Sequence, residues 1–147
     1  MKSWAIRNLK KANIRTQSLV IIYCSLIRSA IEYAAPVYAH FLTGEQSQAL
    51  ERLQMQSLKT IFGFKHSYDH CLRLSGLQKL ETRREKLVLK FAQKLAGNPM
   101  WNHWFPLQPE CPHNLRRTRT YREEFASKER LKNSPIFAMR RLLNNQL

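Results

Sequence analysis

Few residues in this chain have the types and spacing that catalysis requires. Asp69 is its single aspartate, whereas a two-metal site for phosphoryl transfer uses paired carboxylates to hold the cations that clamp the attacking and leaving oxygens. Ser25 and Ser29 lie in an apolar stretch without a neighbouring histidine. The four glycines form neither a Gly-x-Ser-x-Gly elbow nor a glycine-rich phosphate loop. We therefore predict that the chain is not an enzyme and takes no small-molecule substrate.

A metal centre is the second chemistry to consider. The candidate ligands are His66, His70, Cys71, Cys111 and His113. The two histidines at positions 66 and 70 share one side of a helix, but the next residue faces another side, and the pair at 111 and 113 lacks the second ligand pair of a zinc finger. We interpret them as surface histidines and a half-buried thiol, and expect no metal and no cofactor. Three widely spaced cysteines favour reduced thiols in an intracellular compartment, nuclear or cytoplasmic.

Excess positive charge is the feature that carries the functional prediction. The 147 residues include 25 Lys and Arg against 10 Asp and Glu, a net charge of +15. Such a chain favours a polyanionic partner, with nucleic acid as the first candidate and an anionic membrane surface as the second, although lysine and arginine also solvate helix surfaces. The candidates for phosphate contact are Arg83, Lys86, Lys90, Lys94, Arg116, Arg117, Arg119, Arg122, Arg130 and Lys132. Contacts of this kind position a polynucleotide without reading its sequence.

The elements that would position these residues are predicted to be helices. Apolar residues at helical spacing predict a helix over residues 19–34, placed at the centre of a bundle because only one polar stripe interrupts its apolar surface. Arg28 and Glu32 are four residues apart in that stripe and can pair. Tyr23 is assigned to the core rather than to base stacking. The uncharged stretch 16–27 is too short to span a bilayer, so we expect no membrane.

Local signals predict three further helices. Thr43 and Gln46 have the spacing of a reciprocal capping pair at a helix start. Ser67 is expected to cap a short helix that Gly76 ends in the left-handed conformation. A longer helix follows over about residues 79–96, with an outward row of basic side chains.

Two adjacent arginines in that longer helix are expected to differ in role. Side chains of neighbouring helical residues point about 100° apart. Arg84 lies one turn before Val88, so we predict that it is partly covered by the core and needs a carboxylate or carbonyl partner. Arg83 is the surface candidate. We group Arg84 with Glu32 and Tyr23 as structural residues.

Composition changes after Gly97 and suggests the domain organisation. Four prolines between Asn98 and His113 argue against regular helix, and the following stretch is basic with little periodicity. Pro135 suits the first turn of a last helix. The fold class we predict is all-α, an irregular helical bundle around one central apolar helix, with a bundle over 1–97, an extended Pro-rich and basic segment over 98–134, and a short C-terminal helix over 135–147.

Four motifs occur in order along the chain. They are YCSLIRSAIEYAAPVY from Tyr23 to Tyr38, LERLQ from Leu50 to Gln54, SGLQKLETRRE from Ser75 to Glu85 and RLKNSPI from Arg130 to Ile136. In this order and at these separations they resemble the region that follows the polymerase core in reverse transcriptases of LINE-like retrotransposons, the non-LTR, jockey-type elements. The resemblance extends from about residue 9 to residue 143, nearly the whole chain.

The resemblance implies a thumb or post-thumb region that helps hold the template and primer duplex or the element RNA. The core of such polymerases carries metal-binding aspartates, including a Tyr-x-Asp-Asp turn, which this chain lacks. The implied partners are nucleic acid bound without sequence preference and the missing upstream polymerase domains. Because Met1 lies just before the matched stretch, we expect a relic reading frame or a truncated gene model. The open alternative is an independent basic helical interaction module, a domesticated transposon fragment that binds a protein or an acidic surface.

Overall fold

The computed structural model describes residues 2–109 and 119–145. Within these ranges the chain forms helices and no strand, and one isolated antiparallel bridge joins Leu107 to Tyr121. The predicted all-α class is therefore confirmed. The chain divides into two compact units, which we call unit 1 (Met1–Ala35 and Leu42–Arg84) and unit 2 (Pro36–Phe41 and Glu85–Leu147).

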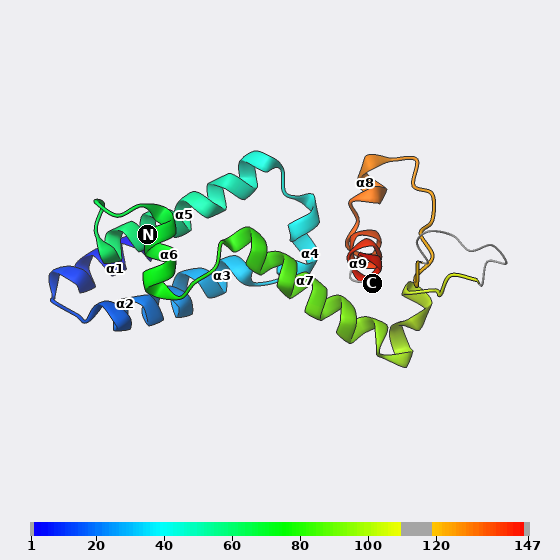
Figure 1. Ribbon diagram of the computed structural model, residues 1–147, viewed down its shortest axis with the longest axis horizontal. Helices are drawn as coiled ribbons and strands as arrows, with labels where there is room; N and C mark the ends of the chain where they lie inside the picture. The colour runs from blue at the N-terminus through cyan, green and yellow to red at the C-terminus, as the bar shows by residue number, and fades with distance from the viewer. Residues whose placement is uncertain (1, 110–118, 146–147) are drawn as a thin grey trace. The chain divides into compact units, whose positions relative to one another are not determined.

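The elements follow one another with short connections through most of the chain (Figure 1). In order they are α1 (Lys2–Lys11), α2 (Thr16–Tyr23), the π-helical turn η1 (Cys24–Arg28), α3 (Ser29–Glu32), α4 (Ala35–Tyr38), the 3-10 turn η2 (Ala39–Phe41), α5 (Gly44–Phe62), α6 (Tyr68–Ser75), α7 (Leu80–Ala96), the 3-10 helix η3 (Pro99–Trp104), α8 (Glu129–Lys132) and α9 (Pro135–Asn144).

In unit 1 the long helix α5 packs against α1, α2 and α6. Its start has the predicted capping box, because the Thr43 hydroxyl accepts from Gln46 N at 3.2 Å and Thr43 N donates to Gln46 Oε1 at 3.0 Å. The predicted cap of α6 is also confirmed, since Ser67 Oγ accepts from a first-turn amide and Gly76 follows the helix at φ 66°. The core of the unit is formed by Ile6, Leu19, Tyr23, Ile27, Leu58, Ile61, Cys71 and Leu72.

The apolar helix predicted over residues 19–34 contains a π-helical turn. Leu19, Tyr23 and Ile27 are buried at strict four-residue spacing. In a regular α-helix each four-residue step turns the side chain about 40° past one full turn, so these three would spiral away from a single face. The wider turn η1 counters this drift. Ile21 and Leu26 are 65% and 52% exposed, so the expected cover on several sides is not present among the described residues.

This helix ends two residues earlier than predicted. Glu32 is its last residue, and Tyr33 and Ala34 then turn the chain at ψ 127° and φ 55°. By length and composition alone the stretch Thr16–Phe41 meets the criterion for a membrane-crossing helix, a criterion that core helices of soluble proteins also meet. The turn at Tyr33 and Ala34 divides the stretch, so its uninterrupted helical part is shorter than its composition suggests.

Unit 2 has its own core. Val88 and Ala92 of α7 pack with Phe105, Met139 and Leu143. The last helix, α9, begins at Pro135 as predicted, at the position where the missing proline N–H needs no partner.

The expected extended segment over residues 98–134 is partly wrong. Pro99 to Trp104 form the 3-10 helix η3, where Pro99 occupies the first turn and Asn98 Oδ1 accepts from Met100 N at 3.0 Å. Proline excludes helix only where its nitrogen would have to donate, and at a helix start it does not. Residues 129–132 form the short helix α8.

Candidate nucleic-acid interface

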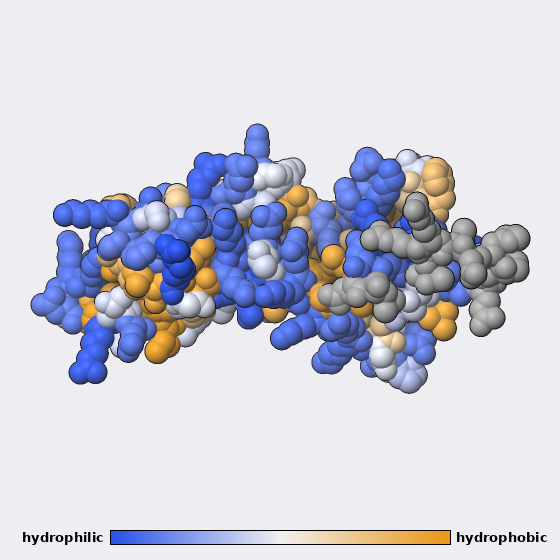
Figure 2. Space-filling view, viewed as in Figure 1, coloured by the Kyte–Doolittle hydropathy of each residue, from blue (hydrophilic) through white to orange (hydrophobic). Residues whose placement is uncertain are grey.

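Both units carry excess positive charge. Unit 1 has 13 Lys and Arg against 5 Asp and Glu, a difference of +8, and unit 2 has 12 against 5, a difference of +7, which together give the +15 of the whole chain. Hydrophilic atoms cover most of the face drawn in Figure 2, and patches of hydrophobic surface interrupt them. The charge that attracts polyanions is therefore not confined to one segment.

The predicted basic row on α7 lies on the outside of that helix in unit 2. Lys86, Lys90 and Lys94 are exposed, whereas Val88 and Ala92 face the core. The lysines follow one another at a rise of about 6 Å per four-residue step. Lys90 and Lys94 have no carboxylate partner among the described residues. Lys90 and Lys94 are thus available to contact phosphates.

Arg83, predicted to be a surface residue, belongs to unit 1 and pairs with Glu32. Its Nε donates to the carboxylate at 3.3 Å, and Arg28 Nε donates to the same oxygen at 2.6 Å, as the sequence predicted for the Arg28–Glu32 pair. The Arg28 and Glu32 side chains are 11% and 14% exposed, and Arg83 is 40% exposed. Burial works against the charged form of Arg28, but its hydrogen bond to Glu32 prevails and raises the pKa of the guanidinium.

Arg84 lies inside unit 1, only 4% exposed. One terminal nitrogen donates to Ser47 Oγ at 2.6 Å, and the other, Nη1, has no hydrogen-bond partner among the described residues. The sequence argument expected a carboxylate or carbonyl partner, and the structure gives a hydroxyl. A buried guanidinium with this partner is not placed to contact phosphate.

A buried amide joins three helical segments of unit 1. Gln54 of α5 is 0% exposed and accepts from the Tyr23 hydroxyl at 2.9 Å. Its Nε2 donates to the Tyr68 hydroxyl at 2.9 Å and to Gln78 O at 3.0 Å. Burial is the main cause that raises the pKa of both tyrosines, so both remain protonated donors at neutral pH. Sequence reasoning placed Tyr23 in the core but missed Gln54.

Glu51, one turn before this glutamine, holds the start of α7. Its carboxylate accepts from Leu80 N at 3.0 Å and from the Tyr68 hydroxyl. A carboxylate at a helix N-terminus satisfies an unpaired amide and complements the helix dipole. The bond from Leu80 N to Glu51 joins the second and third motifs. Together with the contacts of Gln54 and Arg83, it means that residues of the first three motifs contact one another within unit 1.

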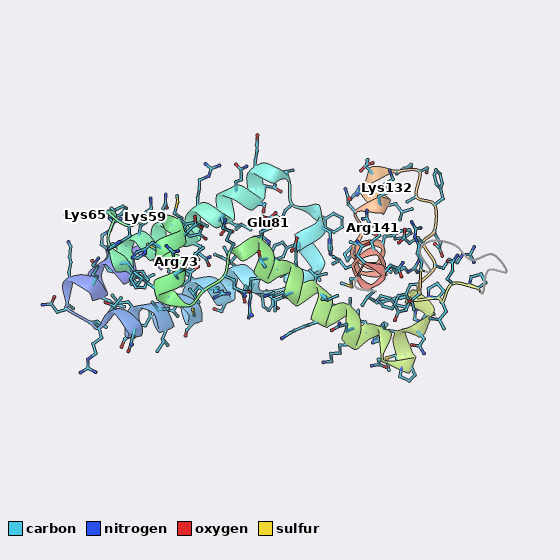
Figure 3. The ribbon with its side chains drawn as sticks, in the orientation of Figure 1. Lys59, Lys65, Arg73, Glu81, Lys132 and Arg141 are labelled. Atoms are coloured by element: carbon cyan, nitrogen blue, oxygen red, sulfur yellow. The ribbon has the colours of Figure 1, made fainter. Side chains whose placement is uncertain are left out.

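The remaining basic candidates lie in unit 2 and differ in their pairing. Arg119 pairs with Glu123 at 3.0 Å, and Lys132 pairs with Glu129 at 3.1 Å. Arg141, which sequence reasoning did not select, donates to Lys132 O at 2.5 Å, so these two basic residues lie together (Figure 3). Arg122 and Arg130 are exposed. Arg116 and Arg117 lie outside the described residues.

Arg140 was also missed, and it is 6% exposed. Its Nε donates to Trp104 O at 2.7 Å, its guanidinium lies 5.4 Å from the centre of the Phe137 ring, and Glu124 is 3.8 Å away. An arginine between the buried residues Met139 and Leu143 of α9 could have been identified from helical spacing. It joins η3 to α9 and is not placed to contact phosphate.

The candidate metal ligands do not form a site within the described part of the chain. No group of three His, Cys, Asp or Glu side chains there is placed to hold a metal ion. His66 and His70 stack with ring centres 4.9 Å apart. Cys71 is fully buried, and this burial raises the pKa of its thiol, which disfavours the thiolate that metals bind. Cys111 and His113 lie outside the described residues.

Comparisons of the chain with protein-family models, with curated proteins and with solved structures give no match. The functional conclusion therefore depends on the sequence motifs and on the placement of the basic residues.

Proposed function

We propose that the chain is a non-catalytic C-terminal part of a LINE-like, non-LTR retrotransposon reverse transcriptase, from its thumb or post-thumb region. Its basic helical surface contacts the template and primer duplex or the element RNA without sequence preference. The observation that carries the proposal is the exposed row of Lys86, Lys90 and Lys94 on α7, two of them without an acidic partner among the described residues. Charges of this kind bind phosphates and release counterions.

The contacts among the motifs support the same proposal. Tyr23 bonds to Gln54, Gln54 bonds to Gln78, and Glu32 pairs with Arg83. Residues of the first three motifs that resemble the polymerase region therefore contact one another in unit 1, as expected if these motifs belong to one structural element of a larger enzyme. The catalytic aspartates of that enzyme lie, in this proposal, in domains upstream.

Two exposed apolar residues of the helix from α2 to α3 are consistent with cover by those upstream domains. Ile21 and Leu26 are 65% and 52% exposed, and domains that packed on this helix would remove their apolar surface from water. We place this helix at the centre of an irregular bundle once the polymerase domains cover it.

The alternative function is an independent basic interaction module, a domesticated transposon fragment that binds a protein. The same exposed side chains favour it, together with Tyr33 at 81% exposed. The two proposals differ in what the lysine row does: a nucleic-acid interface needs it, and a protein-binding apolar face does not.

The test is the affinity of the full chain for labelled duplex and RNA as a function of salt. A triple variant, Lys86→Gln with Lys90→Gln and Lys94→Gln, removes the row. A matched control removes three other exposed cations with Arg7→Gln, Lys11→Gln and Arg15→Gln. We expect the first variant to reduce the salt slope by roughly 0.9 for each duplex phosphate that the row no longer neutralises, and the control to change it less. Equal slopes in the two variants would refute a role for α7.

A further inference from the structure

The connection between α5 and α6 forms a tight turn with an aromatic ring at its tip. Gly63 ends α5 at φ 110°, a conformation that glycine adopts without a steric cost. His66 N donates to Gly63 O at 3.4 Å, which places Phe64 and Lys65 at the two central positions of a turn. Phe64 is 72% exposed.

Contacts on the α6 side of the turn order its backbone. Ser67 Oγ accepts from His70 N at 3.3 Å and starts α6. The His66 ring stacks on the His70 ring at 4.9 Å. The Phe64 ring therefore projects from an ordered turn and is not a side chain folded onto the core. An aromatic side chain on an ordered backbone has only two side-chain torsions to fix when a ligand stacks on it, so the loss of conformational freedom is small.

Three cations lie in the turn and on the two helices that it connects. Lys65 is the neighbour of Phe64 in the turn, Lys59 lies in the last turn of α5, and Arg73 lies in the last turn of α6. Figure 3 shows these three side chains at the end of unit 1 where α5 meets α6. Lys10 of α1 reaches the same helix end, where its Nζ donates to Thr60 O at 2.7 Å.

The acidic residue of α6 does not cancel this charge. Asp69 lies 3.8 Å from Lys79, so a lysine already balances it. An exposed aromatic ring among cations has the chemistry of sites that bind single-stranded nucleic acid, in which a base stacks on the ring and cations contact the neighbouring phosphates. Paired bases in a duplex cannot offer their faces to such a ring.

We propose that the turn from Gly63 to His66 is a binding site for a single-stranded polynucleotide. One base stacks on Phe64, while Lys65, Lys59 and Arg73 contact the flanking phosphates. This site rests on the proposed function, because it assumes that nucleic acid is the partner, and it adds a contact for an unpaired strand that the α7 row does not supply.

The experiment uses the full chain and two labelled twelve-nucleotide strands. One is oligo(dT), and the other is an oligo(dT) of the same length whose central nucleotides lack their bases. Phe64→Ala removes the ring, and Tyr33→Ala, at a position 81% exposed in the same unit, is the matched control. We expect Phe64→Ala to weaken binding of oligo(dT) about tenfold, with an unchanged salt slope and no loss on the abasic strand. Phe64→Tyr keeps a ring and should retain affinity.

A second variant tests the phosphate contacts separately. Lys65→Gln should lower the salt slope for the single strand by about 0.7 and weaken both strands alike. If Phe64→Ala has no effect on oligo(dT), or weakens both strands equally, the ring does not stack on a base and the proposed site is wrong. That result leaves the α7 interface intact. If no strand or duplex binds with a salt-dependent affinity, the proposed function itself fails.

Discussion

The Tyr23 hydroxyl donates a 2.9 Å hydrogen bond to Gln54 Oε1, between two fully buried residues that are 31 positions apart in the chain. The same amide donates to Tyr68 and to the Gln78 carbonyl. A buried amide with three partners stabilises unit 1 only while all of them are satisfied, because each unpaired buried polar group costs free energy.

Replacing this amide should destabilise unit 1 strongly. In Gln54→Leu the Tyr23 hydroxyl and the Gln78 carbonyl each lose a buried partner, at roughly 2 to 4 kcal/mol in total. Urea denaturation followed by circular dichroism measures the change. Gln56→Leu, at an exposed position of the same helix, is the control and should change stability by less than about 0.5 kcal/mol. Similar losses in both variants would contradict the network.

The buried Tyr23 and the partly buried Tyr68 should be resistant to ionisation. Burial raises the pKa of Tyr23 and of Tyr68, and for Tyr68 the hydrogen bond to Glu51 adds to the effect. In an ultraviolet titration, the folded chain should retain Tyr23 and Tyr68 in the protonated form at a pH where the urea-unfolded chain has already lost these protons.

This shift also sets the sign of a pH dependence. A group whose pKa is raised in the folded state contributes stability that is complete below its unfolded pKa, about 10 for tyrosine, and is lost as the pH rises above it. Above this pH, we expect the free energy of unfolding of Tyr23→Phe to fall less steeply with rising pH than that of the wild type. Parallel curves would show that the ionisation of Tyr23 is not coupled to folding.

Glu32 should be coupled more strongly to Arg28 than to Arg83. The first pair is shorter, 2.6 Å against 3.3 Å, and Arg28 is less exposed than Arg83, 11% against 40%. Double-mutant cycles with Glu32→Gln, Arg28→Gln and Arg83→Gln should give about 1 to 2 kcal/mol for the first pair and under about 1 kcal/mol for the second. Equal coupling energies would show that solvent screening does not separate the two pairs.

Caps and glycine stops were predicted correctly because their causes are local. Thr43 and Gln46 are three residues apart, and Gly76 acts on the helix directly before it. The pairing of Arg83 with Glu32 spans 51 positions, so no local pattern could indicate it. Burial at Ile27 but not at Leu26 depends on the π-helical turn, which a 3.6-residue period does not contain. Pro99 was misjudged because position within a helix decides what proline does.

The chain alone should not synthesise DNA. The proposed non-catalytic role predicts this result, and the single aspartate of the sequence agrees with it, because the polymerases that the chain resembles bind two metal ions through more than one aspartate. Primer extension with purified protein, magnesium and the four nucleotides should give no product above a protein-free control. Incorporation that depends on magnesium would show that the chain carries a catalytic site.

The central claim is that this basic surface binds nucleic acid through its phosphates. The most direct measurement is the affinity of the wild-type chain for a primer and template duplex at increasing salt concentration. We expect the logarithm of the association constant to fall linearly with the logarithm of salt concentration, with a slope of several units. Affinity that is absent at low salt, or that does not change with salt, would contradict the claim.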